Sequence, residues 1–112
     1  MRAGQLRHRI TLEWYREGQR SDSGATPTEW IPEAQSRWAE VKPLSTRMTF
    51  EADKANSDTT HTVRLRWRQD IANATGETLR LVHEGRIYRV DGRPMDKDGR
   101  RRELEIRCHE WV

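Results

Sequence analysis

Short stretches of the chain alternate between hydrophobic and polar residues with a period of two, which is typical of half-buried antiparallel strands. The stretches cover residues 5–12, 38–44, 62–68, 86–90 and 104–110. The most regular stretch predicts that Val63, Leu65 and Trp67 face the core. In the first stretch, Ile10 and Leu12 share the predicted inner face. The pattern therefore predicts a chain built mainly from short strands.

The segments between these strands carry loop and helix signals. Residues 16–27 have no periodicity and contain many turn-forming residues, so we expect a long mobile loop there. Residues 46–56 are predicted to form the one inserted α-helix, because Met48, Ala52 and Ala55 recur on one helical face. Many short strands with one helix and no internal repeat predict a mainly-β domain over residues 1–112, a small antiparallel β-barrel or sandwich.

The sequence also predicts the type of several connections in the second half of the chain. Residues 83–85 are predicted to form a tight turn, and Asp98-Gly99 favours a type I′ hairpin turn before the last strand. Residues 70–77 are predicted to be a polar connection.

The composition predicts a small core. Leu, Ile, Val and Phe together supply 18 of the 112 residues, which is below the level of about a fifth at which disorder becomes a concern. The net charge is only +3, however, and five Trp residues supply large apolar surfaces. We therefore expect a folded chain whose long loops become fully ordered only against partners.

The basic residues are very unequal in type, with 18 Arg and 3 Lys. The planar guanidinium group of Arg suits carboxylate or phosphate pairing and burial in interfaces. A genome rich in G and C would produce the same bias. Because 18 acidic residues are interspersed with the basic ones, the charge balance does not by itself indicate nucleic-acid binding.

The sequence contains few features that indicate the cellular compartment of the protein. Cys108 is the single cysteine, so an internal disulfide is excluded and a reducing compartment is favoured. The first residues lack the apolar stretch of a signal peptide, and no apolar run approaches membrane-spanning length. We expect a protein that is cytosolic or assembled from the cytosol, without a membrane partner.

Three arginines of the most regular stretch, Arg64, Arg66 and Arg68, are predicted to form a cationic row on the outer face. Successive members of such a row lie about 6–7 Å apart along a strand. The row has three interpretations: a solvated outer face, pairing with acidic residues of a neighbouring subunit, or contact with DNA phosphates.

Enzymatic or metal chemistry has little support in the sequence. The residues that could bind zinc are His8, His61, His83, Cys108 and His109. Only the last two are close in sequence, and adjacent strand residues point to opposite faces. Cys108 is predicted to lie on the inner face as a small hydrophobic residue. We predict no catalytic, cofactor-binding or metal-binding residues.

The five Trp residues divide into two groups. Trp14, Trp38 and Trp67 lie within strand patterns and are predicted to belong to the core. Trp30, beside the predicted loop, and Trp111, near the end of the chain, are better candidates for partner contact.

Several segments, taken in order, resemble the phage head–tail joining family, the head-closure or stopper proteins of long-tailed bacteriophages. The segments are residues 4–12, Trp38-Ala39-Glu40-Val41 with Pro43-Leu44, residues 62–68 followed by Ile71, residues 85–90 and residues 102–110. The resemblance covers nearly the whole chain, and it depends on the order and spacing of the segments.

The resemblance implies a small β-barrel with a helical insert that joins a ring at the portal vertex of a DNA-filled head. Such a virion neck component is assembled in the host cytoplasm, has no enzymatic activity, closes the channel after packaging and provides a docking surface for the tail. The implied partners are a portal-bound adaptor ring, a tail terminator or tail completion protein, further copies of the chain in a cyclic oligomer, and genomic DNA in the lumen.

Candidate residues follow from this interpretation. The predicted channel or docking loop contains Arg16, Gly18, Arg20, Asp22 and Gly24. The predicted subunit or partner interface contains Arg64, Arg66, Arg68, Trp30, Trp111 and Met48. The alternative function is a small nucleic-acid-binding barrel that uses the arginine row together with an exposed Trp.

Overall fold

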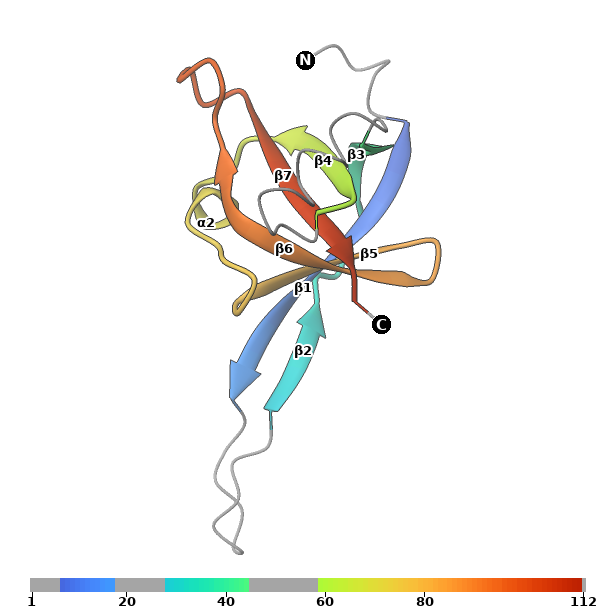
Figure 1. The fold of residues 1–112 in the computed structure, drawn as a ribbon. Coiled ribbons are helices and arrows are strands. Elements are labelled where there is room, and N and C mark those ends of the chain that lie inside the picture. The colour runs from blue at the N-terminus through green and yellow to red at the C-terminus, as the bar shows by residue number, and fades with distance from the viewer. Residues whose placement is uncertain (1–6, 18–27, 45–58, 112) are drawn as a thin grey trace, which may run out of the picture.

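A β-barrel forms the centre of the computed structural model, which describes residues 7–17, 28–44 and 59–111 (Figure 1). The described elements are β1 (His8–Glu17), β2 (Thr28–Pro32), β3 (Arg37–Pro43), β4 (His61–Arg66), α2 (Gln69–Ala72), β5 (Leu79–His83), β6 (Arg86–Met95) and β7 (Glu103–Glu110). The predicted helix over residues 46–56, with Met48, lies outside the described residues. So do the predicted loop residues Gly18, Arg20, Asp22 and Gly24.

Six of the strands close the barrel in the order β1-β3-β4-β7-β6-β5, and β5 returns to pair with β1. All of these pairings are antiparallel. Closure leaves these six strands without the open edges that a flat sheet would expose. The prediction of a mainly-β antiparallel barrel is confirmed.

The core fills the barrel with the inward-facing residues of the strands. These are Ile10, Leu12, Ala39, Val63, Leu65, Leu79, Leu81, Tyr88, Val90, Leu104, Ile106 and Cys108. The alternation predicted for Val63 and Leu65 is confirmed, since both are fully buried. Trp67 lies just past the end of β4 and is partly buried against this core.

The connection between β4 and β5 is not the purely polar segment that the sequence predicted. It contains the four-residue helix α2, and the side chains of Ile71 and Ala74 are buried in the barrel core. Ile71, Ala72 and Ala74 are too few to give a periodic signal in a polar segment, although Ile71 and Ala74 belong to the core and Ala72 packs against it. Within the described residues, no helix has the length and apolarity that crossing a membrane requires.

The β1–β2 hairpin projects from the barrel (Figure 1). Residues His8–Ile10 of β1 pair with β3, and residues Glu13–Glu17 pair with β2, so the end of β1 leaves the barrel wall. The predicted loop therefore begins too early: Arg16 and Glu17 are strand residues, opposite Glu29 and Thr28. Arg16 and Glu17 are adjacent polar residues, so they carry no alternation that would extend the predicted strand.

The structure describes both segments near the end of the chain for which the sequence predicts a tight turn. Glu84 and Gly85 have φ angles of 51° and 77°, which confirms a tight turn between β5 and β6. The type I′ turn predicted at Asp98-Gly99 is wrong, because Asp98 is not in the left-handed region. A longer connection runs from Met95 to Glu103, and the Asp96 and Asp98 carboxylates accept hydrogen bonds from the backbone N–H groups of its own arginines.

Candidate protein interface

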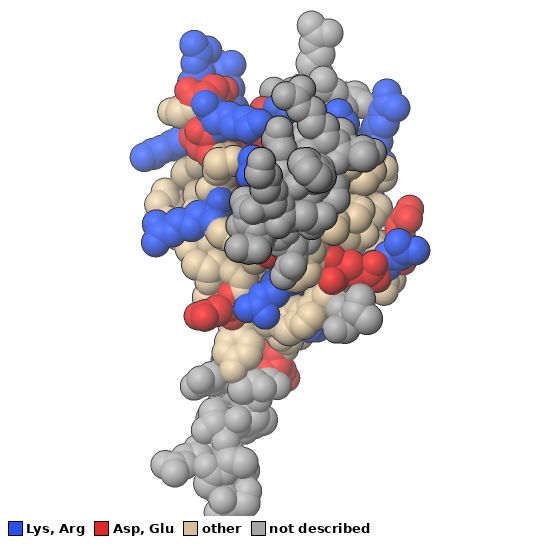
Figure 2. Space-filling model, viewed as in Figure 1, with Lys and Arg blue, Asp and Glu red and all other residues tan. Residues whose placement is uncertain are grey.

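The three residues of the predicted arginine row lie in different environments. Arg64 pairs with Glu103 across β4 and β7, with 3.0 Å between Nη2 and Oε1. Arg66 is exposed, whereas Arg68 lies beyond the end of β4 and bonds to two carboxylates. On the face drawn in Figure 2, basic side chains are likewise interspersed with acidic ones. The role of these arginines in an interface stays a prediction.

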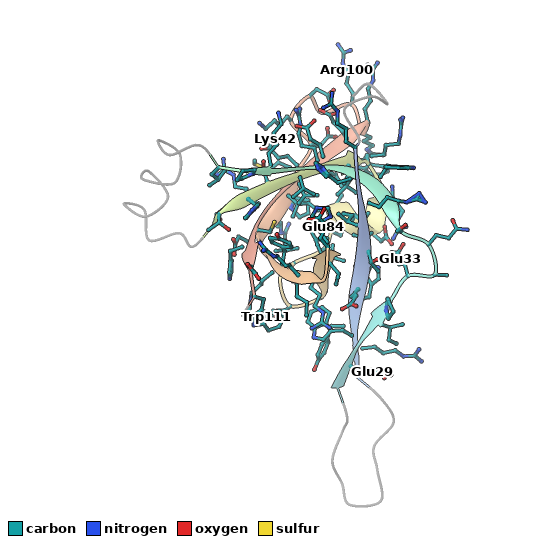
Figure 3. All side chains as sticks on the ribbon, turned by 90° about the vertical axis from the view of Figure 1, so that its right-hand side faces the viewer. Glu29, Glu33, Lys42, Glu84, Arg100 and Trp111 are labelled. Carbon is teal, nitrogen blue, oxygen red and sulfur yellow. The ribbon has the colours of Figure 1, made fainter. Side chains whose placement is uncertain are left out.

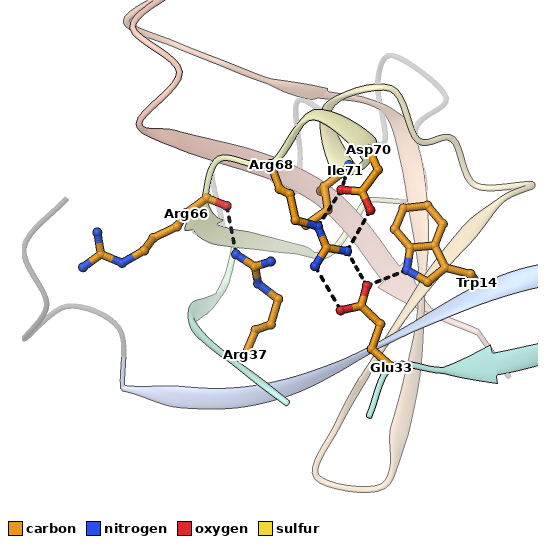
Figure 4. Close-up of polar contacts among 7 residues, drawn as sticks. All are labelled: Trp14, Glu33, Arg37, Arg66, Arg68, Asp70 and Ile71. Carbon is orange, nitrogen blue, oxygen red and sulfur yellow. Dashed lines mark hydrogen bonds and ion pairs between the residues drawn. The ribbon is translucent and has the colours of Figure 1, made fainter. Parts of the chain in front are cut away.

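Arg68 forms the centre of a polar network that also contains Trp14, Glu33 and Asp70 (Figure 4). Its guanidinium group donates two hydrogen bonds to Glu33, which follows β2, and two to Asp70 in the first turn of α2. The indole N–H of Trp14 donates to the same Glu33 carboxylate at 2.6 Å. We call these four residues the Arg68 network. It ties the root of the hairpin to the connection after β4.

The charges in the Arg68 network stabilise one another. The hydrogen bonds that Arg68 donates to Glu33 and Asp70 raise its pKa further above the ordinary value. The hydrogen bond from Arg68 lowers the pKa of Glu33. Burial opposes ionisation of Asp70, but the hydrogen bond and charge of Arg68 outweigh it, so the pKa of Asp70 is also lowered. All three groups are therefore charged at neutral pH.

Arg37 adds a further positive charge beside the network. Burial, together with the charge of Arg68, lowers the pKa of Arg37. Its guanidinium group donates to the backbone carbonyl oxygen of Arg66 at 3.4 Å and bonds to neither acid of the network.

An aromatic cluster lies on the other face of the hairpin root. The rings of Tyr15 and Trp30 meet edge to face with centroids 5.4 Å apart, and Trp30 and Trp111 do so at 5.9 Å. We call these three residues the aromatic cluster. Figure 3 shows Trp111 and Glu33 on opposite sides of the β1 ribbon, so the aromatic cluster and the Arg68 network hold the hairpin from two sides.

Two arginines cover the rings of this cluster. The Arg80 guanidinium lies 4.8 Å from the centroid of Trp30, and that of Arg89 lies 5.3 Å from Trp111. Arg80 also forms an ion pair with Glu13 of β1 at 2.5 Å. Such cation–π contacts fix the rings in place.

The aromatic cluster remains accessible. Tyr15 is 38% exposed and Trp111 is 39% exposed. Exposed, rigid aromatic side chains next to arginine have the composition of the anchoring residues in protein interfaces. The cluster offers no group positioned for chemistry, and we interpret it as a surface for contact with another protein.

The sequence identified part of this surface. It predicted partner contact for Trp30 and Trp111, which the fold brings together from distant positions, and that role stays a prediction. It missed Tyr15, Arg80 and Arg89. Tyr15 is an aromatic residue in the polar phase of the first strand, directly after Trp14, and this was the available signal.

The three Trp residues predicted to be in the core differ in how far they are buried. Trp14 and Trp67 are partly buried against the core. The prediction for Trp38 is wrong, because this side chain is 52% exposed on the outside of the barrel. Ala39 takes the inward position of β3, since it pairs with the buried Leu65 of β4.

Cys108 lies on the inner face of β7 and is fully buried, as predicted. Burial raises the pKa of its thiol to about 12. In residues 7–17, 28–44 and 59–111, no three His, Cys, Asp or Glu side chains gather closely enough to hold a metal ion.

Comparison with known proteins agrees with this architecture. A family model described as phage head completion protein matches residues 1–110. The fold is similar to the solution structure of protein SF1141 from Shigella flexneri 2a, with 27% sequence identity, a TM-score of 0.76, and coverage of 100% of this chain and 98% of that one. A chain in the virion of a native gene transfer agent particle shares the fold at 18% identity, with a TM-score of 0.60 and 96% of each chain covered. Among curated proteins, none matches the sequence.

Proposed function

The chain belongs to the phage head completion protein family, whose members are structural components of virions, and on that premise we propose that it is a ring-forming subunit of the neck. In this proposal, several copies assemble on the portal vertex after DNA packaging. The ring closes the channel against DNA escape and presents a docking surface for the tail.

The observation that carries the proposal is the hairpin that projects from the barrel and is held on both sides at its root (Figures 1 and 3). A stopper must present a segment at a fixed place against the pressure of packaged DNA. The Arg68 network on one side and the aromatic cluster on the other supply that fixation. The barrel then serves as a rigid base for the hairpin, because six strands close around its core.

The remaining surfaces suit contacts with other virion proteins. We assign the aromatic cluster, with Trp30 and Trp111, to contact with a neighbour in the neck. The neighbours are a portal-bound adaptor ring, a tail terminator or tail completion protein, and further copies of the chain. Genomic DNA occupies the lumen of the ring. Arg64, Arg66, Arg68 and Met48 remain assigned to subunit or partner contacts, and residues 16–27 to the channel or docking segment.

Electron microscopy of reconstituted particles tests the proposal. The purified protein is added to DNA-filled heads that lack tails and this protein, and the particles are averaged with and without it. The proposal predicts additional ring-shaped density at one vertex. Density at no vertex, or equal decoration of the whole shell, would contradict a neck role.

A further inference from the structure

Trp38 lies at the centre of an arginine-flanked surface on the outside of the barrel. Arg9 of β1 is its direct cross-strand neighbour. On the other side, Ala39 pairs with Leu65, so the same register continued by one residue places Arg66 of β4 opposite Trp38. We call Arg9, Trp38 and Arg66 the Trp38 surface. It is separate from the aromatic cluster, which lies at the hairpin root.

The Trp38 surface is organised without any partner present. The Arg9 guanidinium lies 4.5 Å from the centroid of the Trp38 ring, and its Nε donates to the Ser36 hydroxyl at 3.1 Å. These two contacts hold the guanidinium over the indole, with its terminal N–H groups available to a further acceptor. The arrangement reduces the conformational entropy that binding would otherwise cost.

Positive charge on the Trp38 surface is not neutralised within the described part of the chain. The acids on the adjacent strands are already paired with other cations: Glu40 with Lys42, Glu103 with Arg64, and Glu105 with Lys97. No acidic side chain of the described residues pairs with Arg9 or Arg66. Two cations therefore flank an indole that is half exposed.

We propose that the Trp38 surface is a docking site for an acidic surface of another virion protein. Carboxylates of that protein pair with Arg9 and Arg66, and an apolar side chain between them packs on Trp38. Charge complementarity carries the assignment, because paired carboxylates would satisfy both guanidinium groups while the indole is covered. The identity of the partner as a neck protein rests on the proposed function above.

A protein partner fits this surface better than duplex DNA. Duplex DNA keeps its bases stacked inside the helix, so it offers the half-exposed indole no base to stack on. Phosphates would pair with the arginines but leave Trp38 without an apolar contact. A protein edge with acidic and apolar side chains engages all three residues.

Binding to two defined particles tests the inference. Wild-type protein, Trp38→Ala, the double variant R9E/R66E and the control R93E/R107E are titrated against DNA-filled tailless heads and against purified tails. The control changes the net charge equally at two other exposed arginines. Because the substituted side chains are exposed, we expect all variants to keep the wild-type melting temperature. Trp38→Ala is expected to weaken binding to heads or tails at least about tenfold, as for an interface hot spot, and R9E/R66E more strongly.

The outcomes separate the alternatives. Wild-type binding that the control retains and both Trp38-surface variants lose supports the inference. Equal binding by all four proteins overturns it and leaves the proposed function intact, whereas no binding of the wild type to either particle overturns the proposed function. Loss confined to salt-sensitive binding of a naked DNA duplex would assign the surface to DNA. Loss confined to self-association, measured by sedimentation, would assign it to a second copy.

Discussion

Replacement of Arg68 by Ala should loosen the root of the hairpin and lower the free energy of unfolding. Arg68 donates two hydrogen bonds to each of two carboxylates, and a hydrogen bond to a charged group contributes about 1.5–3 kcal/mol when it is well shielded. The shielding here is partial, since the side chain of Arg68 is 36% exposed and that of Asp70 is 53% exposed. After a discount for solvent screening, we expect a loss of about 2 kcal/mol, mostly from Glu33.

The pH dependence of this loss gives a sharper signature than its size. The folded-state pKa values of Glu33 and Asp70 are lowered by Arg68, so their stabilising effect is complete above their unfolded-state pKa values. It disappears as the pH falls through the lowered folded-state values. The difference in unfolding free energy between wild type and Arg68→Ala should therefore be constant from about pH 8 to 6 and shrink below about pH 4.

Urea unfolding followed by Trp fluorescence measures this difference. At neutral pH, the melting temperature of Arg68→Ala should also fall by roughly 8 °C, from about 4 °C per kcal/mol for a chain of this size. Arg107→Ala serves as the control, because Arg107 is exposed on the barrel, and should change the stability by less than about 0.5 kcal/mol. An Arg68→Ala protein as stable as wild type at pH 7, or a difference that grows in acid, would refute the reasoning.

Three further predictions concern the barrel itself. Gly76→Ala should destabilise the fold by about 1–3 kcal/mol in urea unfolding, because the added Cβ would collide with the carbonyl oxygen of Val90, and wild-type stability would contradict the close approach. The Cys108 thiol should react with a thiol reagent at pH 8 only after unfolding, since burial raises its pKa to about 12; rapid labelling of the native protein would refute this. Burial lowers the pKa of His61, so an NMR titration should give a value below 6.5, and a value at or above 6.5 would contradict this prediction. Because the folded state favours the neutral ring, the free energy of unfolding should decrease as the pH falls from about 7 to 5.

The barrel was predictable because its strands carry local signals. Val63 and Leu65 alternate with polar residues, and the same period of two recurs in each strand that faces the core. The phase of β3 was harder to read, because Trp38 and Ala39 are both apolar and adjacent. The large side chain suggested the core, but pairing with Leu65 directs the small one inward.

The interface residues were less predictable because they depend on contacts between distant segments. Trp30 and Trp111 meet only after the barrel closes and brings the end of the chain beside the root of the hairpin. Similarly, Glu33 has no local feature that marks it as the partner of Arg68. Patterns of alternation identify which residues face outward, but they do not indicate which outward residues become neighbours.

The most direct test of the neck role measures DNA retention and tail joining with the same particles. DNA-filled heads produced without this protein are incubated with or without it, and the DNA that remains protected from nuclease is quantified before purified tails are added. The proposed function predicts that the protein increases both the protected DNA and the fraction of heads that acquire tails. Unchanged DNA leakage together with unchanged tail joining would contradict it.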